Sequence, residues 1–105
     1  MRQNVVSIVR CTPKPGKTEE VLDVLREVAP SIHDEDGCLL YAIHVADDGD
    51  IWFVEKWEDL AAVERHATQS PVIPILQART SPLLEGPPIV INTTAVPIGG
   101  AKGAI

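Results

Sequence analysis

The hydrophobic residues gather in four short segments, which predict four strands. The segments 4–12, 38–45, 51–57 and 87–96 are rich in β-branched and other apolar residues, and Pro, Gly or Asp residues interrupt the chain between them. The sequence DDGD at 47–50 predicts a hairpin turn between the second and third strands.

Two segments show helical periodicity instead. Thr18 is a candidate N-cap for the first helix, because Glu19 and Glu20 follow it and suit the positive end of a helix dipole. Pro30 is expected to bend this helix or to end it early. The residues that recur at helical spacing are Val21, Val24, Leu25, Val28 and Ile32.

The second predicted helix covers 60–69, with Asp59 as its N-cap and Pro71 as its stop. The stretch 71–85 is expected to be less regular and only partly helical, because Pro74 and Pro82 interrupt it.

The resulting order, β, α, β, β, α, β, predicts an α+β fold of the ferredoxin-like type, with helices on one face of a four-stranded antiparallel sheet. We assign residues 1–96 to this domain and residues 97–105 to a Gly-rich C-terminal tail.

The predicted strands carry apolar residues on both of their sides. In the first strand Val5 and Val9 alternate with Val6 and Ile8. Because helices on one face cannot cover the other, we expect the second face to pack on an identical sheet in a homodimer. An open apolar cleft for a ligand is the alternative, and both hold if the sheets enclose a cavity.

Composition narrows the function classes. The chain has 105 residues and a net charge of −6, and its nine basic residues are scattered, which argues against nucleic acid as a partner. No apolar run reaches the ~18 residues of a membrane span and no signal peptide is recognisable, so we expect a cytoplasmic protein that does not bind membranes.

Motifs for common cofactors are absent. The sequence has no GxGxxG, GxxxxGK[ST], HExxH or GxSxG, and Cys11 and Cys38 form no CxxC. We therefore expect no nucleotide, flavin or metal cofactor, and we expect the two cysteines to be buried thiols.

Phe53, Glu55 and Trp57 share one side of the third strand, which places a carboxylate between two large rings. If this side faces away from the helices, Glu55 lies in or beside the enclosed cavity. Burial without a partner would raise the pKa of Glu55 and make it a proton carrier, whereas a nearby Arg10 would keep it ionised and structural. The paired, structural interpretation is favoured, because buried carboxylates are more often paired than catalytic.

His66 lies on the apolar flank of the second predicted helix, three residues after Val63 and four after Ala62. An imidazole there could take a proton from a phenol or an enol. The alternative is a histidine that binds a loop backbone or covers the edge of the dimer.

Other candidate pocket residues carry weaker signals. Tyr41 and His44 fall on opposite faces of the second strand, so at most one shares the inner face. Phe53 and Tyr41 could line a pocket or belong to the core. The candidate polar groups of a pocket are Asn4, Ser7 and Asn92.

Three stretches in order, KPGKTEEVLDVL, EDGCLLYAIH and FVEKWEDLAAVERHATQSP, resemble the antibiotic biosynthesis monooxygenase family, in particular its quinol monooxygenase-like members. The resemblance covers roughly residues 5–96. It implies a dimeric α/β barrel and oxidation of a small quinol or other aromatic substrate by dioxygen without a cofactor. It also implies that His66 transfers protons, that Glu55 and Trp57 shape the site, and that Tyr41 supports it.

The resemblance leaves the reaction open. Haem-degrading relatives need a histidine after the second helix, and the stretch PVIPILQART at 71–80 has none. The family also contains isomerases and proteins without a known activity, so fold kinship does not fix the chemistry. The alternatives to a monooxygenase are an isomerase or tautomerase of a small metabolite and a non-catalytic dimer that binds a small ligand.

Overall fold

The computed structural model describes residues 3–105, so the first two residues of the predicted domain lie outside the described chain. Its sheet consists of β1 (Val5–Cys11), β2 (Cys38–Val45), β3 (Ile51–Trp57) and β4 (Ile89–Thr94). All three neighbouring pairs are antiparallel and the strand order is β2-β3-β1-β4. This arrangement confirms the predicted ferredoxin-like α+β fold.

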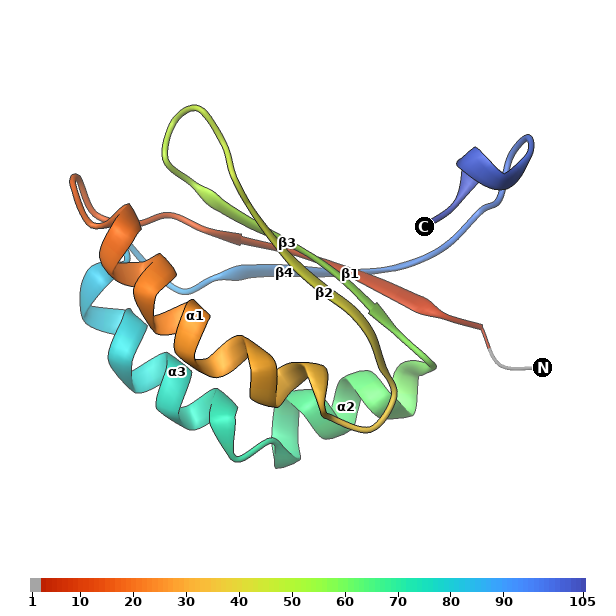
Figure 1. Cartoon of the computed structure of the whole chain (residues 1–105), viewed down its shortest axis with the longest axis horizontal. Coiled ribbons are helices and arrows are strands. Elements are labelled where there is room, and N and C mark those ends of the chain that lie inside the picture. Colours follow the sequence, from red (N-terminus) through yellow and green to blue (C-terminus); the bar gives the residue numbers. More distant parts are fainter. Residues whose placement is uncertain (1–2) are drawn as a thin grey trace.

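Three α-helices, α1 (Thr18–His33), α2 (Leu60–Gln69) and α3 (Val72–Thr80), lie on one side of the sheet (Figure 1). The short 3-10 helices η1 (Ser81–Leu83) and η2 (Ala101–Gly103) follow in the second half of the chain. The C-terminus lies on the opposite side of the sheet from the α-helices, where Lys56 Nζ donates to the backbone oxygen of Ile105 at 2.7 Å. No helix among residues 3–105 is long and apolar enough to cross a membrane.

The predicted start of the first helix needs a correction. α1 does begin at Thr18, but Lys17 occupies the cap position and no side chain caps the helix there. The Thr18 hydroxyl donates to the carbonyl oxygen of Gly49 at 3.0 Å, in the β2–β3 turn. Thr18 therefore ties the helix to the hairpin and does not cap it.

Proline has less effect on the helices than the sequence suggests. α1 continues through Pro30 to His33, with Ile32 completely buried. The segment after Pro71 is also more regular than expected, because α3 runs over nine residues with Pro74 in its first turn. A proline costs little there, since the first-turn N–H groups have no partner inside the helix.

The prediction that Asp59 caps the second helix is confirmed. Its carboxylate accepts a hydrogen bond of 2.9 Å from the backbone N–H of Ala62. This cap fixes the start of α2, and hence the direction in which that helix presents His66 to the sheet.

The sheet has an apolar side toward the helices and a second apolar side away from them. The helix-facing core includes Val9, Phe53 and the fully buried Trp57, which pack against α1 and α2. On the other side, Trp52 and Ile91 are exposed apolar residues and Val6 is buried. The doubly apolar strands predicted from the sequence are thus present.

The orientation of the third strand differs from the one considered in the sequence analysis. We considered Phe53, Glu55 and Trp57 on the side away from the helices, but they face the helices, with the Trp57 ring 4.5 Å from the ring of His66 on α2. Strand periodicity shows which residues share a side, whereas only the packing of the helices shows which side is covered.

Candidate active site

A cavity of about 250 Å³ lies between the sheet and the helices. Side chains from all of α1, α2, α3, β1, β3 and β4 line it, together with Tyr41 of β2. Most of them are apolar, among them Leu25, Val63 and Ile73. Val90 and Asn92 of the edge strand line the cavity and are nevertheless exposed, so the cavity opens beside β4.

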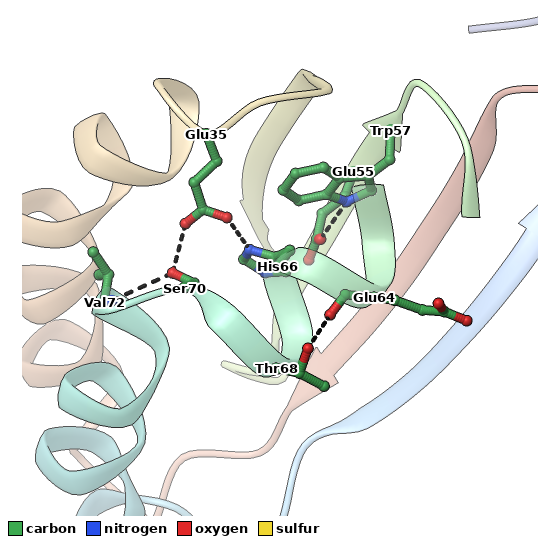
Figure 2. A network of polar contacts seen from close by, with 8 residues as sticks. All are labelled: Glu35, Glu55, Trp57, Glu64, His66, Thr68, Ser70 and Val72. Atoms are coloured by element: carbon green, nitrogen blue, oxygen red, sulfur yellow. Dashed lines mark hydrogen bonds and ion pairs between the residues drawn. The ribbon is translucent and has the colours of Figure 1, made fainter. Parts of the chain in front are cut away.

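His66 is the titratable group that α2 projects into this cavity. Its side chain is 13% exposed, and its Nδ1 lies 2.7 Å from Oε1 of Glu35. The other carboxylate oxygen of Glu35 accepts a hydrogen bond of 2.7 Å from Ser70, at the C-terminal end of α2 (Figure 2). Glu35 thus holds both the ring of His66 and the end of the helix that carries it.

The Glu35 contact determines which nitrogen of His66 is available. A carboxylate only accepts, so Nδ1 carries the proton that it donates to Glu35. In the neutral ring Nε2 then keeps a lone pair and can accept a proton, and the carboxylate stabilises the imidazolium that results. The Trp57 ring stacks beside the imidazole at 4.5 Å and an angle of 32°. The two contacts together restrict the ring to one orientation.

Glu55 lies in the same cavity with a different environment. It is 5% exposed, and the indole N–H of Trp57 donates to its Oε1 at 3.0 Å. Burial raises the pKa of Glu55, an effect that the Trp57 hydrogen bond and the nearby His66 oppose. The ionised form of this carboxyl group is therefore disfavoured.

The predicted partner of Glu55 is elsewhere. Arg10 faces away from the helices, where it pairs with the buried Asp50 at 2.6 Å and lies over the ring of Trp52. Adjacent residues of a strand point to opposite faces, so Arg10 of β1 cannot reach the side that Glu55 occupies. The predicted pairing of Glu55 with Arg10 is therefore wrong: the partner of the buried Glu55 carboxyl group is the indole N–H of Trp57, and burial raises its pKa.

Tyr41 and Phe53 also line the cavity, with their rings edge to face at 5.6 Å. The Tyr41 ring lies 6.2 Å from that of His66. Burial raises the pKa of the Tyr41 phenol, so this side chain stays protonated. The structure therefore brings His66, Glu55, Trp57, Tyr41 and Phe53 together.

Three candidate residues do not line the cavity. Trp57 lies behind His66 and contacts its ring, and the other two lie further away. His44 is exposed on the face of β2 away from the helices, paired in register with Trp52. Asn4 precedes β1, and its amide N–H donates to the carbonyl oxygen of Glu58 at the β3–α2 connection. Tyr41 and His44 point to opposite faces of β2, so His44 cannot line the cavity when Tyr41 does. Asn4 precedes Ser7, the first residue of β1 that lines the cavity.

The cysteines differ from each other and form no disulfide. Cys11 is buried and lines the cavity, and burial raises its pKa to about 11. Cys38 is only half-buried, so the expectation of two buried thiols holds for Cys11 alone. Among residues 3–105, no three His, Cys, Asp or Glu side chains are grouped so that they could hold a metal ion.

Glu35 is the residue that the sequence reasoning missed. It lies in the turn DEDG between α1 and β2, which by composition is an ordinary solvated turn. Its two partners lie 31 and 35 positions further along the chain, so no local spacing connects them. The acidic turn that precedes β2 gives only a weak signal for a site residue.

The fold and the cavity define a class of small α+β domains that enclose a mostly apolar chamber with a carboxylate-bound histidine. Residues 4–72 match the family described as antibiotic biosynthesis monooxygenase, and the chain belongs to this family. A comparison with curated proteins finds no match.

Solved structures share the fold of this chain. The chain is similar to a protein from Pseudomonas aeruginosa at 26% identity and a TM-score of 0.81, over 91% of this chain and 97% of the other. A protein from Mycobacterium tuberculosis is 25% identical with a TM-score of 0.79, over 93% and 98% of the two chains. A candidate antibiotic biosynthesis monooxygenase from Nitrosomonas europaea, at 17% identity and a TM-score of 0.83 over 94% and 97%, shares the fold.

Proposed function

We propose that this protein is a cofactor-independent monooxygenase that oxidises a small quinol with dioxygen, and that His66 is its general base. The observation that carries the proposal is the 2.7 Å contact between His66 Nδ1 and Glu35 at the wall of a mostly apolar cavity. Family membership supports the class of reaction.

In the proposed reaction, Nε2 of His66 takes the proton of a quinol hydroxyl, and Glu35 stabilises the imidazolium. The resulting anion is electron-rich and gives electrons to dioxygen. One oxygen atom bonds to a ring carbon, which loses its hydrogen, and the other leaves as water. The balanced reaction is quinol plus dioxygen to hydroxyquinone plus water, and the ring supplies all four electrons.

The remaining cavity residues have supporting roles in this proposal. Tyr41 positions the substrate ring, and the mostly apolar lining keeps water from the anion. Trp57, which does not line the cavity, fixes the imidazole by packing against it. Glu55, with its pKa raised by burial, supplies a proton to the developing water molecule.

The test measures oxygen uptake with 1,4-dihydroxynaphthalene as the substrate of protein stripped of metals. His66→Ala is expected to lower kcat by about 10²- to 10⁴-fold, the usual contribution of a general base. His44→Ala is the matched control, because it removes an exposed imidazole outside the cavity and should leave the rate unchanged. Uptake no faster than the uncatalysed rate with the wild-type protein would rule the proposal out.

A second candidate function, isomerisation or tautomerisation of a small metabolite, is favoured by one observation. His66 and Glu55 provide two proton-carrying groups in one cavity, and enolisation needs one group to remove a proton and another to return it. Turnover of an enolisable ketone under anaerobic conditions would support this function, whereas a monooxygenase requires dioxygen.

We also propose that two copies of the chain associate through the sheet face away from the helices. Trp52, Ile89 and Ile91 are exposed apolar side chains on that face, and the α-helices all lie on the other side (Figure 1). An identical sheet offers the same extended apolar surface, as an isologous dimer requires. Sedimentation at micromolar concentration tests this, and a single-chain species would contradict it.

A further inference from the structure

A row of polar side chains crosses the floor of the cavity. The strand order and register align Tyr41 of β2, Glu55 of β3, Ser7 of β1 and Asn92 of β4, and all four line the cavity. Ser7 and Asn92 are bonded to each other, because the Ser7 hydroxyl donates to Oδ1 of Asn92 at 2.7 Å. Tyr41 and Glu55, which are paired in register, form the other half of the row.

The hydroxyl group of Tyr41 reaches the cavity without a hydrogen-bond partner. Tyr41 is 6% exposed, its hydrogen bond to Nε2 of His33 uses the backbone oxygen, and its hydroxyl bonds to no residue within 3–105. Among the unexposed residues of this range, Nε of Arg65 is the one side-chain N or O atom that is both unpartnered and fully enclosed by protein atoms. The Tyr41 hydroxyl is therefore not enclosed, and the open space that Tyr41 lines is the cavity.

The carboxyl group of Glu55 presents its second oxygen in the same way. The indole N–H of Trp57 donates to Oε1 at 3.0 Å (Figure 2), whereas Oε2 has no partner among the described residues and is not enclosed. Burial raises the pKa of Glu55, which favours the protonated carboxyl group. Because Oε1 already accepts from Trp57, the proton belongs on Oε2, which then is a second O–H donor beside Tyr41.

The two donors lie next to the candidate base. The Tyr41 ring packs edge to face on Phe53 at 5.6 Å and lies 6.2 Å from the ring of His66. Directly paired residues of antiparallel strands have Cβ atoms about 4.5–5.5 Å apart, so Tyr41 and Glu55 serve the same part of the cavity. Two fixed neutral donors can stabilise an anion in an apolar site, and a phenol with a protonated carboxylic acid is a combination that enolising enzymes use.

We infer that the Tyr41 hydroxyl and the Glu55 carboxyl group form a two-donor site that binds the oxyanion left when His66 removes a proton from the substrate. A hydrogen bond leaves the proton on Glu55, so this proton remains available for the later step in which water forms. The inference rests on the proposed function, because it takes His66 as the group that ionises the substrate.

The test compares two ligands that differ in their ability to ionise. 2-Chloro-4-nitrophenol is mostly an anion at pH 7, whereas 2-chloro-4-nitroanisole has the same ring and no acidic hydrogen. The wild-type protein is expected to bind the phenolate about tenfold or more tightly than the ether, because hydrogen bonds to a charged group are the stronger ones. Isothermal titration calorimetry gives both dissociation constants, and the absorption spectrum of the bound phenol shows that the anion is the form that binds.

Variants assign this preference to the two donors. Tyr41→Phe keeps the ring and removes the hydroxyl, so it should reduce the preference about tenfold or more and leave the affinity for the ether within about twofold. Glu55→Leu should reduce the preference similarly, whereas Glu55→Gln replaces the O–H donor by an N–H donor and should keep most of it. Thr80→Val is the control, because the Thr80 hydroxyl lines the cavity but already donates to the carbonyl oxygen of Leu76 at 2.7 Å.

Glu55→Gln also distinguishes a protonated carboxyl group from an ionised one. A carboxylate would repel the phenolate, so its replacement by a neutral amide would tighten phenolate binding by more than tenfold, and this result overturns the inference. A wild-type protein that binds the ether as tightly as the phenolate overturns it as well, and so does a preference that survives Tyr41→Phe.

Oxygen uptake separates this inference from the proposed function. A phenolate preference that depends on Tyr41 and on a donor at position 55 supports the oxyanion site even if no quinol is oxidised. Conversely, uptake with 1,4-dihydroxynaphthalene at a kcat that is unchanged in Tyr41→Phe supports the monooxygenase and refutes the oxyanion site.

Discussion

Glu35→Gln tests the central contact of the proposed site, because it keeps the size of the side chain and removes its charge. Glu35 accepts one hydrogen bond from His66 and one from Ser70, both at 2.7 Å. A glutamine has a single oxygen, so its NH2 group must face one of these two donors. The substitution therefore disrupts the orientation of His66 and removes the negative charge that stabilises its imidazolium.

The expected size of the effect follows from the geometry. The His66 and Glu35 side chains are 13% and 17% exposed, so solvent screens their contact little. A hydrogen bond to a charged group contributes about 1.5–3 kcal/mol, which corresponds to a decrease in kcat of about 10- to 150-fold. The KM for the quinol should change much less, because Glu35 acts through His66 and does not line the cavity.

Two assays check this prediction. Oxygen uptake with 1,4-dihydroxynaphthalene gives kcat and KM, and ¹⁵N chemical shifts of the imidazole report which ring nitrogen carries the proton. Asp36→Asn is the matched control: it removes a charge one residue further along in the same turn, where Arg65 lies 3.7 Å away and the aspartate side chain is 91% exposed. An Nε2–H tautomer in the wild-type protein, or an unchanged kcat in Glu35→Gln, would refute the reasoning.

Three further predictions concern stability and assembly. Burial raises the pKa of Glu55, so the free energy of unfolding decreases as the pH rises from about 4.5 through the raised pKa. Glu55→Gln should therefore be more stable than the wild type above this window and no more stable below it. Urea unfolding at pH 4 and pH 8 measures the difference. Gly37→Ala should destabilise the fold by roughly 2 kcal/mol or more, because φ at Gly37 is +85° and the new Cβ would lie 2.6 Å from the Cβ of Ala62. Gly16→Ala is the control, because φ there is +75° but the new Cβ meets open space, so only the backbone cost remains. Thermal melts that show equal losses for both variants would mean that the contact with Ala62 is unimportant. Trp52→Glu buries a charge in the proposed interface and should convert the dimer to monomers, as sedimentation would show. Oxygen uptake by the same variant reports separately whether the activity of the cavity is retained. An unchanged dimer would mean that the interface lies elsewhere.

Local sequence signals were sufficient for the elements that depend on neighbouring residues. Asp59 caps α2 because its carboxylate needs only the N–H of Ala62, three residues away. The apolar spacing along α1 likewise identifies the side that is buried, from Val21 to Ile32. Two local signals misled. Pro30 and Pro74 both lie inside helices, and Thr18 does not cap α1.

The candidate site was predictable only in part. The position of His66 on the apolar flank of its helix follows from helical periodicity, and the structure places it in the cavity. The environment of Glu55 was misjudged, because Arg10 was assumed to be within reach of it. Neighbouring strands present alternate residues to a given face, so the register of β1 and β3 had to be known before that pair could be excluded.

The sequence by itself determined the four strands, the first two helices with the buried side of α1, and the resemblance to the family, because these depend on periodicity and on residues close together in the chain. Only the tertiary structure decided that Glu35 meets His66 across 31 positions, and that the polar row from Tyr41 to Asn92 crosses four strands. The physical reason is that such contacts form when separate elements pack into layers. Their partners are selected by strand register and helix placement, which no short stretch of sequence encodes.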